Sequence, residues 1–175
     1  MNELLKLMQT RRSVRKYTGE AVPAEKLEAI LQSALLSPSG KGAYPFDLVV
    51  VEDRATLDKL ADCRVGASRM LEKAGAAVVV LGDSAKSDTI IEDCSIVLTS
   101  MHLMAHALGL GSCWIQGRLR QAPDGRSTEE YLREILGFPE THRLEAILSI
   151  GVPAEAPAPH ALEALDSSRV HREKF

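Results

Sequence analysis

Aromatic residues are scarce in this chain of 175 residues, where Phe, Tyr and Trp together make up 4% of the sequence. So few aromatic side chains leave few stacking platforms for single-stranded nucleic acid. A surplus of one charge is missing too, because 21 basic residues stand against 24 acidic residues and the net charge is −3. The chain therefore lacks an electrostatic footprint for DNA, RNA or an anionic membrane, and we expect none of these partners.

Cysteine is also rare, with Cys63, Cys94 and Cys113 and no CxxC pair among them. An odd number of widely spaced cysteines argues against a disulfide framework or a zinc site, so we expect buried, reduced thiols. No apolar stretch is long enough to span a bilayer, and the first residues lack the layout of a signal peptide. These features predict a soluble, cytoplasmic protein.

The hydrophobic content of 45% is enough for one compact domain over residues 1–175. The apolar spacing predicts a helix from Glu3 to about Thr10 and a second helix that starts near Pro23. Asp53 and Ser127 are suited to cap two shorter helices. The sequence further predicts strands over 46–51, 76–81 and 144–150. Alternating helices and buried strands indicate an α/β or α+β arrangement in three layers.

A long helix is predicted from Thr89, with Glu92 completing a capping box, to Leu108. Its residues are apolar nearly all round, so one face can fill the domain's own core while another would be left in water. We expect a second copy of the chain to cover that outward face, on which we place Leu98 and Met101. The sequence thus predicts a homodimer built on this helix.

A basic cluster follows the first helix and contains Arg11, Arg12 and Arg15, with Ser13 between them. Guanidinium groups bind phosphate in a bidentate manner better than the lysine ammonium does. A solvated basic turn would give the same pattern, so the cluster alone leaves both readings open.

A loop rich in small residues, Ser37 to Phe46, leads into the first strand. Pro38, Ser39, Gly40 and Gly42 would let the backbone approach a flat ligand closely, although an ordinary helix-to-strand loop would look the same. A third segment runs from the end of the long helix through Gly109-Leu110-Gly111-Ser112-Cys113-Trp114-Ile115-Gln116-Gly117.

In this order and spacing the three segments resemble the nitroreductase family of FMN enzymes. That family shows an RRS-x-R/K start, an SPS-x-x-N loop and a long helix ending in GLG-x-x-W-I-x-G. Gly151 and the end of the chain, residues 170–175, also resemble its shorter members. The resemblance covers most of the chain, and the joint match is far more specific than any single segment.

The resemblance implies an α+β, three-layer α/β/α fold with a mixed central sheet, dimeric with a long interface helix. It implies FMN at the interface of a homodimer and NAD(P)H as the donor of reducing equivalents to nitroaromatic, quinone-like or other oxidised small molecules. No side chain is then strictly catalytic, because the cofactor carries the redox chemistry. The residues expected to bind the cofactor are Arg11, Arg12, Ser13, Arg15, Pro38, Ser39, Gly40, Gly42, Ile115, Gln116, Gly117, Arg172 and Lys174.

By the same resemblance, Arg11, Arg12 and Ser13 hold the FMN phosphate, and Arg15 lies near N1 and O2 of the ring. The loop 38–40 lines the ring from the other subunit, and 115–117 follows its edge, with the Gly117 amide close to N5. Within the tail 152–175, which is expected to dock on the dimer, residues 172 and 174 come round to the phosphate.

Two departures from the family pattern stand out. Gly42 replaces the usual Asn, which removes a side-chain hydrogen bond to the flavin, and Tyr44 and Phe46 replace the usual Gln and Trp. The short connection between Leu81 and Thr89 leaves no room for a large helical insertion. We therefore expect an open site with broad specificity.

Other interpretations remain open at this point. A flavin dehydrogenase with one physiological substrate, a flavin-binding protein without turnover, or a basic-arm module without cofactor would each share these motifs. His102 and His106 have the spacing of metal ligands, but no third ligand is evident in the sequence. We therefore expect these histidines to pack in the core or at an interface, and we expect no metal site. Cys113 has no neighbouring base, which favours packing over nucleophilic chemistry.

Overall fold

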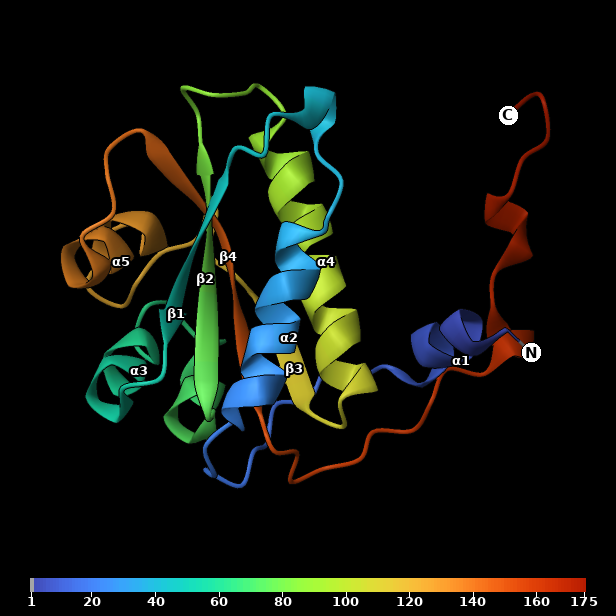
Figure 1. Cartoon of the computed structure of the whole chain (residues 1–175), viewed down its shortest axis with the longest axis horizontal. Helices are drawn as coiled ribbons and strands as arrows, with labels where there is room; N and C mark the ends of the chain where they lie inside the picture. Colours follow the sequence, from blue (N-terminus) through green and yellow to red (C-terminus); the bar gives the residue numbers. More distant parts are fainter. Residues whose placement is uncertain (1) are drawn as a thin grey trace.

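The computed structural model describes residues 2–175 and shows helices on both sides of one sheet (Figure 1). The strands are β1 (Phe46–Val51), β2 (Ala76–Asp83), β3 (Gly111–Gln116) and β4 (His142–Gly151). Helices α2 (Ala24–Leu35) and α4 (Ile90–Ala107) cover one face, and α3 (Arg54–Leu60) and α5 (Thr128–Leu136) the other. Helix α1 (Glu3–Thr10) stands apart from these layers. Short 3₁₀ turns occupy Gly40–Gly42, Arg69–Lys73, Leu162–Ala164 and Ser167–Arg169.

The sheet has four strands in the order β1-β2-β4-β3, and all three ladders are antiparallel. The expected α+β class is confirmed, but the expectation of a mixed sheet is wrong. The crossover through α4 does join two strands that run in the same direction, β2 and β3, yet β4 inserts between them. Within residues 2–175, the parallel contact is a single isolated bridge between Ser13 and Ser112.

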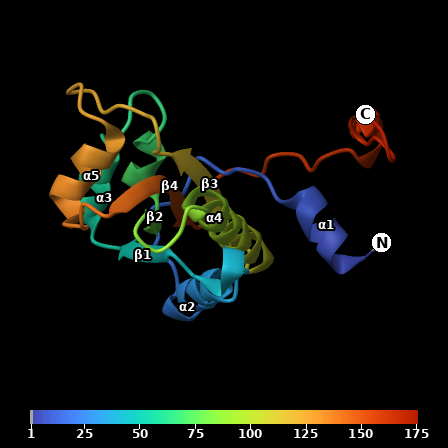
Figure 2. The same ribbon diagram turned by 90° about the horizontal axis from the view of Figure 1, so that it is seen from above.

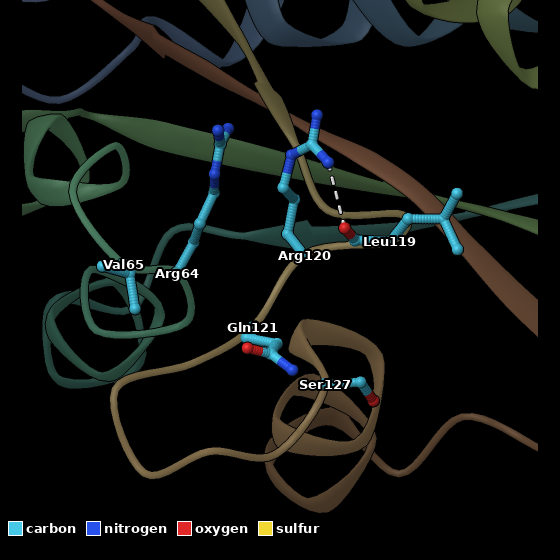
Figure 3. A pocket seen from close by; sticks show the side chains of 6 residues that line it. All are labelled: Arg64, Val65, Leu119, Arg120, Gln121 and Ser127. Atoms are coloured by element: carbon cyan, nitrogen blue, oxygen red, sulfur yellow. Dashed lines mark hydrogen bonds between the residues drawn. The ribbon is translucent and has the colours of Figure 1, made fainter.

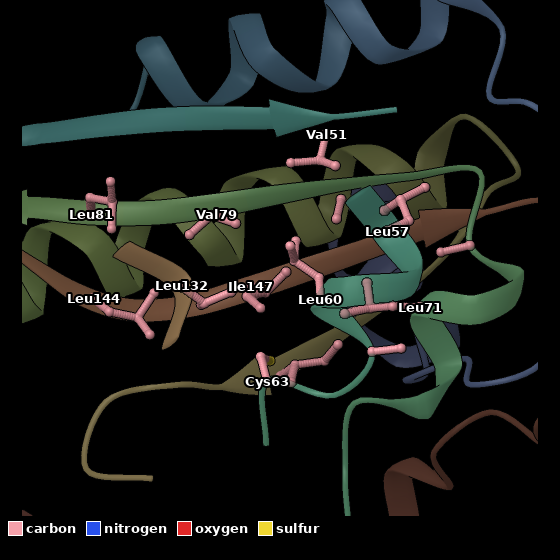
Figure 4. Packing of buried hydrophobic residues seen from close by; sticks show 14 of the residues in the cluster. Val51, Leu57, Leu60, Cys63, Leu71, Val79, Leu81, Leu132, Leu144 and Ile147 are labelled. Carbon is pink, nitrogen blue, oxygen red and sulfur yellow. The ribbon is translucent and has the colours of Figure 1, made fainter. Parts of the chain in front are cut away.

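Strand β2 is buried on both sides and divides the core into two clusters. Ala77, Val79 and Leu81 face α3 and α5, whereas the alternate residues face α2 and α4, as the period of a strand requires (Figure 4). The first cluster is filled from the helices mainly by Leu57, Leu60 and Leu132. The second is filled mainly by Ile30, Val97, Leu98 and Met101.

The two faces of α4 differ from the placement expected from the sequence. Leu98 and Met101 are fully buried against the sheet, so placing them on the outward face is wrong. Ile96, which is 39% exposed, and Thr99 face outward, with Leu103 half-buried beside them. When a helix is apolar on every side, its sequence pattern does not indicate which face is buried, and only packing decides which side contacts the sheet.

Local capping signals predict the shorter helices well. Asp53 accepts a hydrogen bond from the Thr56 amide, and Ser127 forms a reciprocal capping box with Glu130. The box expected at the start of α4 is wrong, because the Thr89 hydroxyl donates to the Asp93 carboxylate instead of capping the backbone. That carboxylate also accepts from the Gly40 amide.

Both ends of the chain extend away from the body as arms (Figures 1 and 2). Helix α1 has no buried residue, and its Leu4 and Met8 are about half exposed. The arms contact each other through several hydrogen bonds, among them those from the His160 amide to the Gln9 carbonyl (3.0 Å) and from Gln9 Nε2 to the His160 carbonyl (3.1 Å). Each arm thus presents apolar side chains that the body of the same chain does not cover.

Both arms leave the body of the fold close to Tyr17, whose side chain is buried in the core cluster on the α3 and α5 side of the sheet. Its hydroxyl donates to the Val14 carbonyl (2.7 Å) and lies 2.8 Å from the Ser149 hydroxyl. A Cβ atom on Gly151 would come within 2.9 Å of the Tyr17 ring, so the ring needs a glycine there. Tyr17 is therefore wedged between the two ends of the chain.

The inward position of Leu98 leads to a prediction about folding. Leu98→Ala should lower the free energy of unfolding by about 2–5 kcal/mol, because it leaves a cavity between α4 and the sheet. Leu36→Ala, at a side chain that is 85% exposed, is the control and should change the value by less than about 0.5 kcal/mol. Chemical denaturation measures both; equal values for the two variants would contradict the assigned face.

Candidate functional site

The basic cluster lies where the chain passes from α1 to the edge of the sheet. The Val14 amide donates to the Ser112 carbonyl (3.0 Å), and Ser13 forms its bridge with the same residue of β3. This pairing fixes the backbone of Arg11 and Arg12 beside the last turns of α4. The structure therefore brings the four expected residues of this segment, 11–13 and 15, to one place.

Arg11 is held by a histidine of α4. Its Nη1 atom lies 2.8 Å from His102 Nε2, and His102 Nδ1 is hydrogen-bonded to the Ser112 hydroxyl. Burial, together with the charge of Arg11, lowers the pKa of His102 to about 4. The ring is therefore neutral at pH 7, so Nε2 accepts from Arg11 and Nδ1–H donates to Ser112. His106 lies 2.9 Å from the Thr10 hydroxyl, so both histidines serve the joint between α1 and α4.

Arg12 and Arg15 keep most of their donors free. Arg12 Nη1 donates to the Ala158 carbonyl. The side chain of Arg15 is exposed, and the backbone amide of this residue donates to the Glu155 carboxylate (2.6 Å). Among residues 2–175, no ion pair joins Arg11, Arg12 or Arg15 to a carboxylate. A cavity of about 240 Å³ adjoins Arg12. Guanidinium groups and a hydroxyl without an acidic partner form a donor set suited to a phosphate.

The loop 38–42 lies at the opposite end of α4. Gly40 packs so closely on this helix that an added Cβ would lie 2.7 Å from Thr89 Oγ1. The Ser39 hydroxyl accepts from the Tyr44 amide (2.9 Å) and tightens the loop, in which Pro38 is exposed. Gly42 has a φ of +65° with open space around it. Asn tolerates this conformation best after glycine, so the departure from the family removes a side chain without changing the turn.

The two aromatic replacements have different fates. Phe46 is buried in the core at the start of β1, so it does not reach the loop surface. Tyr44 is about half exposed and meets Phe46 edge-on, with 6.4 Å between ring centroids. Of the two, Tyr44 can contact a ligand.

The third segment contains β3 and the residue after it, Gly117, which lies very close to β4. Ile115 is buried in the core, and the Gln116 side chain accepts from Trp114 Nε1 (2.8 Å). A Cβ on Gly117 would lie 2.5 Å from the Leu144 side chain, which explains the glycine. The Gly117 amide donates to the Glu145 carbonyl (3.2 Å), so the donor expected near a flavin N5 already has a partner within the chain.

The expected site residues do not converge within one chain. Helix α4 has 18 residues and is about 27 Å long. Arg11 contacts it near its C-terminal end through His102, whereas Gly40 contacts Asp93 near its N-terminal end. Arg172 and Lys174 lie on the exposed tail, and no hydrogen bond among the described residues links them to the basic cluster. Along the helix axis His102 and Asp93 are about 13.5 Å apart, so the basic cluster and the loop 38–42 meet α4 at different levels.

Sequence reasoning missed Glu145, a buried carboxylate beside Gly117. A β-bulge in the β2–β4 ladder skips Glu145, which is 5% exposed, and its Oε2 atom has no hydrogen-bond partner. Burial raises the pKa of this carboxyl and Glu92 raises it further, while Arg118 and Gln116 lower it. The only signal in the sequence is one charged residue inside the strand Leu144 to Ile150, whose other residues are apolar apart from Ser149.

Comparisons with known proteins define the class of this fold. The chain superimposes on an FMN-dependent nitroreductase from Clostridium difficile R20291 with a TM-score of 0.95 and 41% identity, over 98% of this chain and 99% of that one. A relative from Archaeoglobus fulgidus, provisionally named NADH dehydrogenase/NAD(P)H nitroreductase, is 35% identical over the full length of both proteins. The FMN reductase [NAD(P)H] of Bacillus subtilis is 25% identical over 90% of this chain and 69% of its own length.

The Nitroreductase family profile matches residues 8–65 and 63–152. The chain belongs to the Nitroreductase family. This confirms the family inferred from the three sequence segments. Within residues 2–175, no helix is long and apolar enough to cross a membrane.

Glu145 leads to a prediction about pH. Its pKa is raised above the ordinary value of 4.5 in the folded state, so the charged form is penalised by folding, and stability is lost as the pH rises through the folded pKa. Glu145→Gln should raise the free energy of unfolding near pH 8, by an amount on the order of 1 kcal/mol, because the neutral amide avoids the cost of burying a charged carboxylate. The gain should vanish below about pH 4. Urea unfolding at both pH values checks this, and a gain independent of pH would contradict it.

Proposed function

We propose that this chain is an FMN-dependent oxidoreductase that passes reducing equivalents from NAD(P)H to nitroaromatic, quinone-like or other oxidised small molecules. The observation that carries the proposal is the donor set of Arg11, Arg12 and Arg15 at the edge of a nitroreductase fold, in which the bonded partners of Arg11 and Arg12 are a histidine and a carbonyl and not carboxylates. Relatives named FMN-dependent nitroreductase and FMN reductase [NAD(P)H] support the same cofactor and donor. The whole chain, residues 1–175, acts as one domain.

The donor set of the basic cluster fits the FMN phosphate. When bound, FMN supplies the hydride and electron transfer, so the protein needs to bind, orient and tune it. Arg11 and Arg12 hold the phosphate with Ser13, and neutral His102 keeps the Arg11 guanidinium in place. Arg15 presents a fixed positive charge to the ring, which favours the anionic reduced form over the neutral oxidised one.

The site is completed by a second copy of the chain. In this arrangement a two-fold axis relates the two chains, and α4 packs antiparallel against its counterpart. The counterpart covers the outward face of α4, which contains Ile96 and Leu103. It also brings the loop 38–42 of one chain, which lies at the N-terminal end of α4, towards Arg11 of the other. The apolar side chains of both arms find cover on the partner in the same arrangement, and the tail 152–175 brings Arg172 and Lys174 to the partner's phosphate site.

The compartment we propose is the cytoplasm. The three cysteines are free and buried in the structure, which suits a reducing environment.

Removing one phosphate donor tests the cofactor assignment. Arg11→Ala should weaken FMN binding at least tenfold, because one charge-assisted hydrogen bond contributes about 1.5–3 kcal/mol. FMN content after dialysis, measured by absorbance, is the readout. Arg69→Ala, at an exposed arginine paired with Glu72, is the control and should retain its flavin. Full occupancy in the Arg11 variant would show that the phosphate lies elsewhere.

Placing a charge on the outward face of α4 tests the dimer. Ile96→Glu should give a monomer by analytical ultracentrifugation and lose FMN at the same time, since the proposed site uses both chains. Val50→Glu, on the edge strand β1 at a side chain of similar exposure, should leave assembly and flavin unchanged. A monomeric wild type that binds FMN would sink the proposed arrangement.

A further inference from the structure

A groove opens beside the end of β3, next to the proposed ring edge. One cavity of about 620 Å³ lies between the loop that follows α3 and the loop that follows β3 (Figure 3). Its walls are Arg64, Val65, Leu119, Arg120, Gln121 and Ser127. A second cavity of about 450 Å³ shares Leu119, Arg120 and Ser127 and continues to Gly117 and Ile90. The groove therefore runs from Gly117 to Arg64.

Backbone hydrogen bonds fix the two loops that form the walls. The Val65 amide donates to the Gln121 carbonyl (3.0 Å), and the Thr128 amide donates to the Arg120 carbonyl (2.9 Å). An isolated bridge between Gln121 and Ser127 adds to these contacts. Because the backbone on both sides is paired, Arg64 and Arg120 project from defined positions, and Figure 3 shows their side chains extending in the same direction.

The two arginines of the groove carry charge that the chain does not neutralise. Arg64 Nη1 donates to the Gln116 carbonyl (3.2 Å) and Arg120 Nη1 to the Leu119 carbonyl (3.0 Å), and no carboxylate in residues 2–175 pairs with either. The nearby acids are already engaged: Asp124 pairs with Arg126 (2.6 Å), and Glu129 pairs with Arg133 (2.8 Å).

The groove also has apolar surface between its charges. Val65 is 62% exposed and Leu119 is 80% exposed, and Leu119 is held with a φ of 57°, a conformation that is uncommon for a residue with a side chain. The Arg120 amide donates to the Gly117 carbonyl (3.1 Å), and this hydrogen bond closes the turn that holds Leu119 in its conformation. Exposed apolar side chains next to unpaired arginines suit a ligand with both phosphate and flat ring groups.

We infer that Arg64 and Arg120 bind the diphosphate of the nicotinamide dinucleotide donor. The inference rests on the proposed function, because it places the nicotinamide beside Gly117 and the rest of the dinucleotide along the groove. Each arginine has a neutral hydrogen-bond acceptor in the free protein and retains further N–H groups for phosphate oxygens. The groove thus accounts for donor recognition without any residue of the FMN phosphate site.

Steady-state kinetics of the purified, FMN-loaded protein test the inference. Arg64→Gln and Arg120→Gln should each raise KM for NADH and NADPH about tenfold, with FMN content and kcat little changed. With 1-benzyl-1,4-dihydronicotinamide, a donor without phosphates, both variants should match the wild type. Arg126→Gln is the matched control, because that arginine lies on the same loop but is neutralised by Asp124 and Glu134.

The outcomes separate this inference from the proposed function. An unchanged KM for both dinucleotides, with normal turnover from the benzyl donor, overturns the groove assignment and leaves the proposed function standing. A second outcome also overturns the groove assignment, in favour of an anionic acceptor. In that outcome Arg64→Gln and Arg120→Gln raise KM for a sulfonated quinone but leave KM for menadione and for NADPH at the wild-type values. No reduction by any nicotinamide donor, in a wild type that dithionite does reduce, contradicts the proposed function itself.

Discussion

Tyr17 joins the parts of this molecule that bear on its function. Its hydroxyl bonds to Val14, next to the basic cluster, and to Ser149 in the central strand β4, while its ring is packed on Gly151 at the start of the tail. Burial raises the pKa of this phenol, so it stays neutral and remains a donor at every physiological pH. One buried side chain thereby sets the direction of both arms and the position of the arginines relative to the sheet.

The parts of the fold that could be predicted from the sequence are those determined by local chemistry. Asp53 and Ser127 cap their helices as their side chains allow, and β2 is recognisable as a strand because it is apolar throughout and buried on both faces. Strand β3 has no such pattern, since it owes its place to pairing with β4, which is distant in sequence. The phase of α4 is hidden for a related reason, because Leu98 and Ile96 look alike until the sheet selects one of them.

The candidate site divides in the same way. Arg11, Arg12 and Ser13 are contiguous, so their association could be read directly, and residues matching a family motif could be assigned in advance. Glu145 and the pair Arg64 and Arg120 belong to no motif. A β-bulge and two loops joined by backbone hydrogen bonds bring them close to the end of β3, and only the folded chain shows this. For His102 the sequence favours a packing role over metal binding, and its contacts in the folded chain show that it also orients an arginine.

Helix α1 contains eight residues and buries none of them. An isolated helix of fewer than about 12–15 residues is marginal in water, so the order of this arm depends on what covers its apolar side. In the proposed dimer, that cover comes from another chain, and the arm carries the phosphate ligands at its exit. Helix content, assembly and cofactor capacity then obey one mass-action law. The amount of active flavoprotein would rise more steeply than the amount of polypeptide, so a cell making little of this chain would hold mostly apoprotein.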